Sequence, residues 1–249
     1  MSRTTARYHE PAPQENDAVA LRRVIAGRRS VRKFTDRPLP QEVLDDCIDL
    51  ALLAPNSSNL QPWAFYQVQS AAKKRALIDI CLGQNAAASA AELIVVVART
   101  DTWREHARLN LEHFPIQPIP KLVQQYYRMV VPLAYTQGPL SSAGHLRRRV
   151  SRLSSRFRPV PQGPCSREEM RLWACKSTAL AAENLMLALR AHGFDSCPME
   201  GFDERRLARL LDLDAHALPI MVIAAGERAP DGVYYPQLRF ARERFVFKV

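Results

Sequence analysis

Three arginines and a serine stand together in the segment Arg28-Arg29-Ser30-Val31-Arg32. Guanidinium groups bind phosphate oxygens through paired hydrogen bonds, and a serine hydroxyl adds one more donor. The segment therefore predicts a site for a phosphate-bearing ligand. Taken alone, it is equally consistent with a basic surface at the point where a helix ends.

A second group of polar residues occupies a predicted loop that ends at the Pro62-Trp63 pair. Its members are Pro55, Asn56, Ser57, Asn59 and Gln61. The hydroxyl and amide side chains could contact a ligand, or they could shape the chain through Asx turns. A third segment, Pro198-Met-Glu-Gly-Phe-Asp203, carries a glycine that permits close approach of the backbone to a ligand.

The common signatures of other enzyme classes are missing. None of the 9 glycines falls in a GxGxxG, P-loop or GxSxG pattern, which argues against Rossmann dehydrogenases, P-loop NTPases and α/β-hydrolases. The 5 cysteines form no CxxC pair and the 6 histidines form no HExxH motif. We therefore expect no metal site, and five reduced and mostly buried thiols.

Hydrophobic periodicity and capping residues predict the elements that position these groups. A long helix capped by Ser166 is expected to form a buried spine as far as about His192, because its interior is rich in Ala and Leu. Further helices are predicted over 18–25 (capped by Asp17 and ended by Gly27), 41–53, 71–82 and a short segment capped by Asp203. Strands are predicted over 65–69, 93–98, 219–226 and 244–249.

The length of 249 residues, with 47% hydrophobic and 24% charged residues, suits one globular domain. Residues 1–16 are expected to form a flexible arm, and 17–249 a single domain. Eight prolines between Pro115 and Pro164 break part of the chain into short helices and loops. The stretch from about 99 to 165 is therefore predicted to be an inserted, lid-like segment.

Four separated patches together resemble the nitroreductase family of flavoproteins. They are Arg28–Arg32, Ala54–Trp63, the Ala181-Ala-Glu-Asn-Leu-Met-Leu187 stretch and Pro198–Asp203. The resemblance covers about residues 17–98 and 166–249. It implies an α+β nitroreductase-like, FMN-dependent fold, in which helices flank a central, mainly antiparallel sheet. It also implies an intertwined homodimer, in which the strand 244–249 crosses to the partner subunit.

The resemblance also implies roles for particular residues. The FMN phosphate would be bound by Arg28, Arg29, Ser30 and Arg32 together with Arg239, and Asn85 would contact the flavin. Pro198, Met199, Glu200 and Gly201 would lie against the isoalloxazine ring; Glu200 and Gly201 are the predicted catalytic positions, with Glu200 positioning rather than transferring a proton. The loop residues Pro55, Asn56, Ser57, Asn59 and Gln61 would reach the flavin across the dimer interface.

The expected activity follows from the same resemblance. NADPH or NADH would reduce the flavin, which would pass electrons in a ping-pong cycle to a nitroaromatic, quinone or similar electron-poor acceptor. The 99–165 segment, with Trp103, Phe114, Tyr126 and Tyr127, would cover the site and select the acceptor. Ala88 and Gln237 stand where enteric relatives have lysines, and Lys33 is a candidate replacement for the missing charge.

Two other functions are compatible with parts of the sequence. One is a specialised member of the same superfamily, of the azoline oxidase or dehalogenase type. The other uses the net charge of +10 and the run Arg147–Arg158 to bind nucleic acid, although little aromatic interleaving accompanies the run. We expect nucleic acid binding to be the less favoured of these. Because the chain lacks an apolar run of spanning length and an apolar N-terminal stretch, we expect a cytoplasmic protein with no membrane partner.

Overall fold

The computed structural model describes residues 16–160 and 163–249, so the predicted arm 1–16 lies almost wholly outside the described residues. Four strands form one sheet in the order β1-β2-β4-β3. They are β1 (Trp63–Gln67), β2 (Glu92–Arg99), β3 (Asp195–Met199) and β4 (Ala217–Gly226), and every neighbouring pair is antiparallel. The predicted α+β architecture is confirmed.

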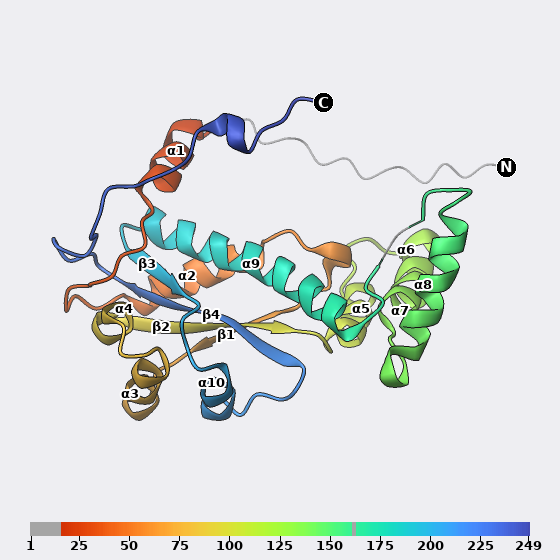
Figure 1. The fold of residues 1–249 in the computed structure, drawn as a ribbon, viewed down its shortest axis with the longest axis horizontal. Helices are drawn as coiled ribbons and strands as arrows, with labels where there is room; N and C mark the ends of the chain where they lie inside the picture. Colours follow the sequence, from red (N-terminus) through yellow and green to blue (C-terminus); the bar gives the residue numbers. More distant parts are fainter. Residues whose placement is uncertain (1–15, 161–162) are drawn as a thin grey trace.

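Helices cover both faces of this sheet (Figure 1). One face packs against α2 (Gln41–Leu52) and α9 (Arg167–Ala191), through residues such as Leu44 and Leu185. The other face packs against α3 (Ala71–Ile80), α4 (Asn85–Ser89) and α10 (Glu204–Leu210). Because β2 is buried on both sides, its sequence is a continuous apolar run rather than an alternating one.

The long helix α9 is the spine that the sequence predicts. Its first turn is capped by Ser166, whose Oγ accepts a hydrogen bond from the Glu169 amide at 3.2 Å. Small residues such as Ala174, Ala181 and Ala182 are fully buried, which lets the helix approach α2 and the sheet closely. The Glu169 carboxylate accepts a hydrogen bond from the Cys165 amide at 2.6 Å, and not from the Ser166 amide as in a capping box.

Several boundaries and elements differ from the predictions. Asp17 occupies the cap position of α1 (Ala18–Gly27), but its side chain makes no capping hydrogen bond. The short strand β3 and the helix α4 were not predicted, because each is too short to show a period. The other predicted strands and helices lie within about two residues of their expected ends.

The predicted C-terminal strand 244–249 is wrong for the single chain. Residues Arg242–Arg244 form a short 3₁₀ turn (η4), and the residues after it have no regular structure and are exposed. The alternating sequence pattern remains, but a strand forms only where a neighbouring strand satisfies its backbone hydrogen bonds. Within the described part of this one chain, the segment has no such neighbour.

The segment 99–165 consists of short helices joined by loops, as predicted. It contains α5 (Trp103–Glu112), α6 (Lys121–Gln125), a π-helical turn η2 (Tyr126–Val130), α7 (Val131–Tyr135), a 3₁₀ turn η3 (Pro139–Ser141) and α8 (Ser142–Ser154). Trp103 packs against Tyr135, and Tyr135 packs against Trp173 of α9, which attaches the segment to the spine. Across 16–160 and 163–249, no helix is both long and apolar enough to cross a membrane.

The five thiols are all free, and four of them are buried, as predicted. We expect Cys47 and Cys81 to be inert in the native protein, because burial raises their thiol pKa values to about 12 and about 11. The reactive thiolate is therefore almost absent at pH 8. The measurement is a disulfide-exchange titration at pH 8 with mass mapping, before and after denaturation. All five thiols should react in the unfolded chain; rapid native modification of Cys47 or Cys81 would contradict the packing described above.

Candidate flavin and phosphate site

Four of the predicted phosphate-binding residues line one cavity of about 230 Å³ together with Arg239. We call this hollow the cation cavity; its lining is Arg28, Arg29, Ser30, Arg32 and the segment Val233–Arg239. The four guanidinium groups and the serine hydroxyl are all donors, and the lining contains no carboxylate. The donor set therefore suits a phosphate group.

Backbone pairing with β3 fixes the segment that carries these cations. Ser30 forms a parallel bridge to Ser196, and the Val31 amide donates to the Ser196 carbonyl at 3.1 Å. Val31 is fully buried in the core, so its neighbours in an extended chain, Ser30 and Arg32, face outward. The Arg32 amide donates to the Gly232 carbonyl at 2.7 Å, which brings the 233–239 segment to the same place.

Gly232 is required for this close approach. A Cβ atom at this position would collide with the Lys33 carbonyl oxygen and would stand 3.0 Å from the Ala229 carbonyl. Both obstacles are backbone atoms, which cannot rotate away as a side chain can. The chain therefore turns beside the cations only because residue 232 has no side chain.

A buried carboxylate supports the cavity from beneath. Asp195 is 2% exposed, and its two oxygens accept from Arg190 Nη1 at 2.7 Å, Arg228 Nε at 3.1 Å and Arg228 Nη2 at 2.8 Å. Arg228 Nη2 also donates to the Gly27 carbonyl at 3.2 Å, at the residue that precedes Arg28. This cluster joins the end of α9, the exit from β4 and the start of β3 to the cation segment.

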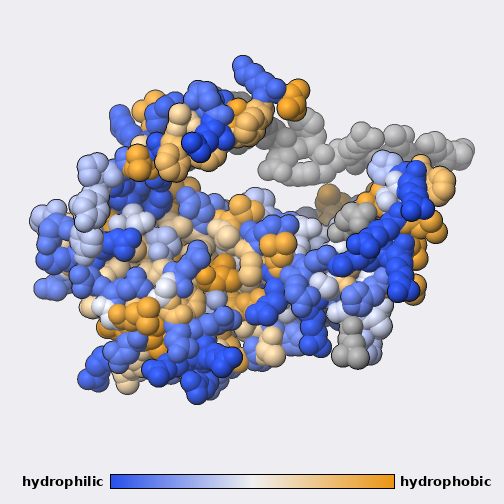
Figure 2. Space-filling view, viewed as in Figure 1, coloured by the Kyte–Doolittle hydropathy of each residue, from blue (hydrophilic) through white to orange (hydrophobic). Residues whose placement is uncertain are grey.

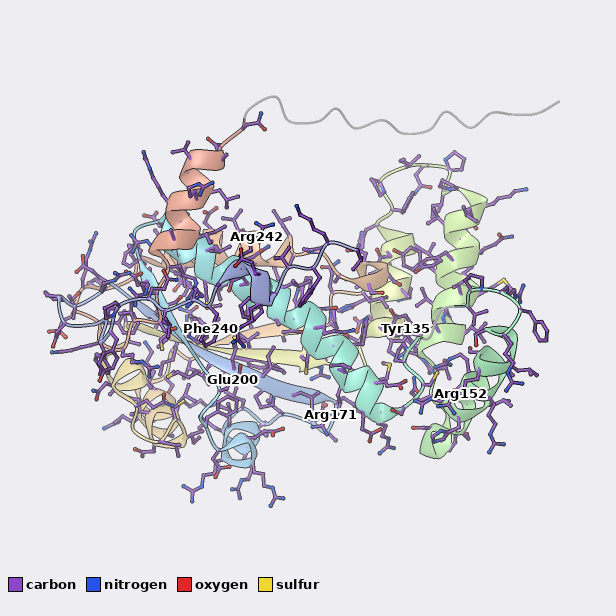
Figure 3. The ribbon with its side chains drawn as sticks, turned by 45° about the horizontal axis from the view of Figure 1, so that its top comes forward. Tyr135, Arg152, Arg171, Glu200, Phe240 and Arg242 are labelled. Carbon is purple, nitrogen blue, oxygen red and sulfur yellow. The ribbon has the colours of Figure 1, made fainter. Side chains whose placement is uncertain are left out.

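The predicted ring-contacting residues are the last two of β3, Pro198 and Met199, and the next two, Glu200 and Gly201. Glu200 lies where the chain leaves β3 toward α10 (Figure 3). Met199 is 3% exposed and packs in the core, so only its backbone can face a ligand, while Pro198 and Glu200 point to the other side. A Cβ on Gly201 would meet only Gln84 Nε2, at 3.4 Å, so this stretch of backbone is otherwise open.

The start of α4 joins this stretch to the cation cavity. Gln84 Nε2 donates to the Gly201 carbonyl at 2.8 Å, and Asn85 Nδ2 donates to the Tyr234 hydroxyl at 3.1 Å. Tyr234 lines the cavity, so Asn85 lies between the ring-contacting stretch and the cations. The structure therefore brings all the predicted residues outside the 55–61 loop into one continuous region.

The 55–61 loop, which we call the polar loop, lies elsewhere in the chain. In Figure 1 it runs from the end of α2 to β1 beside α5, away from the cation segment that follows α1. Asn59 and Asn110 of α5 exchange hydrogen bonds of 2.7 and 2.8 Å, and His106 Nδ1 lies 2.6 Å from the Leu60 carbonyl oxygen. The single chain does not bring the polar loop to the cavity.

The polar loop holds an unusual backbone conformation. Ser58, Asn59 and Gln61 have φ angles of 60°, 49° and 42°, in the left-handed region that costs L-residues energy. Tyrosines of η2 restrain the loop: Tyr127 Oη donates to the Ser58 carbonyl at 3.1 Å, and Tyr126 Oη lies 2.7 Å from Ser58 Oγ. The 99–165 segment thus determines the shape of the loop.

Two predicted contributors have other roles, and several residues were missed. Lys33 does not line the cavity; it forms a 2.7 Å ion pair with Asp231, whose hydrogen bond and charge raise the Lys33 pKa. Gln237 lines the cavity without a charge, and Ala88 is exposed on α4. Sequence reasoning missed Gln84, Tyr234, Tyr235 and Asp195, because these are isolated polar residues outside any motif.

The positive charges of the arginines affect the pKa of a neighbouring thiol, Cys197. Burial raises the pKa of Cys197, while the charges of Arg32 and Arg28 oppose that rise. Arg28 Nε also lies 4.0 Å from a carboxylate oxygen of Glu183 on α9, which is half exposed.

Among the residues that the structure describes, no group of three or more His, Cys, Asp or Glu side chains could hold a metal ion.

Comparison with known proteins agrees with this geometry. The model of the nitroreductase family matches residues 25–227. The chain is 30% identical over 219 residues to the NADH dehydrogenase of Thermus thermophilus, covering 88% of this chain and 91% of that protein. The solved structure of Bacillus subtilis ydfN superimposes with a TM-score of 0.73 at 23% identity, covering 93% of this chain and 99% of that one.

A further structure was solved in complex with FMN. It comes from Exiguobacterium sibiricum and matches with a TM-score of 0.68 at 20% identity, over 92% of this chain and 97% of the other. The fold is that of the nitroreductase-like α+β proteins. The chain belongs to the nitroreductase family.

We predict that Asp195→Asn lowers the free energy of unfolding by roughly 3 kcal/mol, because it leaves two guanidinium groups without their carboxylate. Chemical denaturation measures the change. Asp46→Asn is the matched control: it removes a half-exposed carboxylate paired with His192 and should cost less than about 1 kcal/mol. Equal effects of the two variants would show that the Asp195 cluster has no special structural role.

Proposed function

We propose that this protein is an FMN-dependent NAD(P)H oxidoreductase that reduces nitroaromatic, quinone or similar electron-poor acceptors. The observation that carries this proposal is the cation cavity, in which Arg28, Arg29, Ser30, Arg32 and Arg239 converge without a carboxylate in the lining. Membership of the nitroreductase family and the FMN complex of a structural neighbour support the choice of flavin.

The residues of the cavity divide into two kinds. Arg32 and Arg239 are exposed and make no ion pair among the described residues, although Arg239 Nη1 donates to the Leu238 carbonyl at 2.8 Å. The Arg32 guanidinium and the remaining donors of Arg239 can therefore bind phosphate oxygens. Arg29 Nη2 donates to the Tyr235 carbonyl at 2.6 Å and so also fastens the cavity wall. The Ser30 hydroxyl adds a neutral donor next to the cations.

The stretch Pro198–Gly201 would lie against the isoalloxazine ring. The absence of a side chain at Gly201 leaves room for a planar group near the backbone, and Gln84 orients the carbonyl of that residue. Glu200 is exposed, and it would position the substrates rather than donate a proton. FMN, when bound, supplies the two-electron chemistry, taking hydride from a reduced nicotinamide and passing electrons to the acceptor.

The second half of the site would come from a partner subunit. We infer a homodimer in which the polar loop of one protomer reaches the cation cavity of the other, since one chain keeps these regions apart. The exposed apolar surface supports this: α1 exposes Val19, Leu21 and Ile25, and the C-terminal segment exposes Phe240, Phe245 and Phe247. Residues 244–249 would then pair as a strand with the partner, which explains their alternating sequence.

We also propose that 17–249 is a single domain in which the 99–165 segment covers the site and selects the acceptor. Tyr126 and Tyr127 contact the polar loop, and Phe114 lines a cavity of about 460 Å³ with Asn59 and Gln61. Trp103 is 6% exposed and packs in the core, so it would anchor the segment rather than touch substrate. One cleft that serves nicotinamide and acceptor in turn implies ping-pong kinetics. We propose that the protein acts in the cytoplasm.

The protein purified without added cofactor should be yellow and should release about one FMN per chain. Arg32→Gln should weaken FMN binding by about 10- to 100-fold, because one charged hydrogen-bonding group to the phosphate is lost. Fluorescence titration of the apoprotein measures the affinity. Arg75→Gln, an exposed arginine on α3, is the control and should bind like the parent. A parent protein that neither carries nor takes up FMN would disprove the proposed function.

Tyr127→Phe should lower kcat/KM for the acceptor by about tenfold while the chain remains folded, because the Tyr127 hydroxyl bonds the Ser58 carbonyl and the Asn110 side chain. Steady-state kinetics with a nitroaromatic and a quinone measure the change, and the parent enzyme should give parallel double-reciprocal lines. Tyr66→Phe serves as the control, since that hydroxyl makes no hydrogen bond among the described residues. Intersecting lines would argue against the ping-pong cycle, and an unchanged Tyr127→Phe enzyme against the role of the loop.

A further inference from the structure

Helix α8 turns an apolar stripe toward the solvent. Leu146, Val150 and Leu153 are 64%, 56% and 59% exposed, and their spacing places them on one face of the helix. Phe157 continues the spacing in the turn after α8 and is 85% exposed. A solvated helix normally keeps its apolar stripe against the protein, so this orientation is the reverse of the ordinary one.

Arginines flank the exposed stripe. Arg149, Arg152 and Arg156 fall on one side of it by helical spacing, and all three are exposed. None of them forms an ion pair among the residues that the structure describes. The surrounding sequence is extreme in charge, because residues 113–167 contain nine Lys and Arg and no Asp or Glu. Arg152 lies at the end of the molecule remote from Glu200 (Figure 3).

The opposite side of α8 is fastened to the protein. Arg147 donates to the carbonyls of Leu133, Thr136 and Pro164, at distances of 2.7, 2.9 and 2.5 Å. Arg148 forms a 2.5 Å ion pair with Glu169 at the start of α9. These two arginines, which belong to the run first considered for nucleic acid, are therefore structural, and they hold α8 with its stripe outward.

Exposed apolar side chains also lie outside α8. Leu133, whose carbonyl accepts from Arg147, is 70% exposed, and Met129 one turn earlier is 67% exposed. In Figure 2, hydrophobic and strongly hydrophilic residues alternate along the edge of the molecule that holds α8. The stripe and its arginine flank form one surface, which we call the α8 face.

We propose that the α8 face docks on the surface of an anionic lipid bilayer. Helices with an apolar face beside basic residues lie in the membrane interface, where the apolar side chains enter the acyl boundary and arginines bind headgroup phosphates. With 13 residues, α8 is too short to span, so the contact is peripheral. This inference concerns the docking of the protein and does not depend on the flavin chemistry.

Charge and shape favour a bilayer over the other occupants. A nucleic acid would neutralise the arginines, but it would leave Leu146, Val150, Leu153 and Phe157 against its charged backbone. A second copy on the same face would bring two cation-rich, acid-free surfaces together, and like charges repel. A surface that is anionic outside and apolar beneath matches both halves of the α8 face.

Vesicle co-sedimentation of the full-length protein tests the proposal. The parent should bind vesicles of equal parts phosphatidylglycerol and phosphatidylcholine, should bind pure phosphatidylcholine far more weakly, and should dissociate at high salt. The triple variant Arg149→Gln, Arg152→Gln, Arg156→Gln should bind on the order of 100-fold more weakly, since each basic residue near the surface contributes about a fivefold factor. The charge-matched control Lys73→Gln, Arg75→Gln, Arg205→Gln removes three exposed cations elsewhere and should keep most of the binding.

Two further variants separate the apolar contribution. Leu153→Ser with Phe157→Ser should weaken vesicle binding on the order of tenfold or more at unchanged melting temperature. Phe157→Trp should keep binding, and the fluorescence of the new tryptophan should shift to the blue on adding anionic vesicles. The three native tryptophans, Trp63, Trp103 and Trp173, are all buried and form the background signal.

Several results would overturn the proposal. They are absence of binding to anionic vesicles by the parent, equal loss in the control triple variant, and steeply salt-dependent binding to DNA or RNA without vesicle binding. A change from dimer to monomer in the Leu153→Ser, Phe157→Ser variant would assign the face to a second copy instead. All of these readouts are independent of FMN content and turnover.

Discussion

The buried carboxylate of Asp195 is the constraint on which the geometry of the cation cavity depends. A carboxylate that is 2% exposed is stable only because two guanidinium groups satisfy both of its oxygens. Those groups come from the end of α9 and the exit of β4, and one of them also holds the Gly27 carbonyl. The end of α9, the exit of β4 and the end of α1 are thereby locked around the start of β3, from which Ser196 extends to pair with Ser30.

The sheet supplies the rigid frame for this cluster. Because β2 and β4 are buried on both faces, the ends of the strands can move only if two packed layers of helices move with them. The polar loop is built differently, since it has three residues at positive φ and depends on hydrogen bonds from α5 and η2. Each strained residue costs on the order of 1–3 kcal/mol, so the loop keeps its shape only while those helices support it.

Arginine has three distinct physical uses in this chain. Arg147, Arg190 and Arg228 bridge carbonyls or carboxylates inside the fold. The arginines of the cation cavity keep donors directed at an open hollow, whereas Arg149 and Arg152 of α8 and Arg156 after it face solvent beside an apolar stripe. A net charge of +10 therefore does not describe one basic surface; the neighbours of each guanidinium determine what it can bind.

Much of the fold could be predicted from local pattern. The cap at Ser166, the Ala-rich interior of α9 and the continuous apolar run of β2 each encode an element within a few neighbouring residues. The short elements β3 and α4 could not be predicted, because five residues carry no readable period and their existence depends on β4 and on the core. The alternating 244–249 segment shows the opposite case, a strand pattern with no strand beside it in the single chain.

The same division applies to the candidate site. The sequence by itself determined where the cationic residues, the amide residues and the glycine without a side chain stand. Their order along the chain resembles that of the nitroreductase family and so identified it. Only the tertiary structure decided that Lys33 is held by Asp231 and that the polar loop lies apart from the cavity within one chain. It also turned Arg147 and Arg148 inward and the apolar stripe of α8 outward. The physical reason is that local propensity acts over a few residues, whereas convergence of side chains depends on long-range pairing and burial.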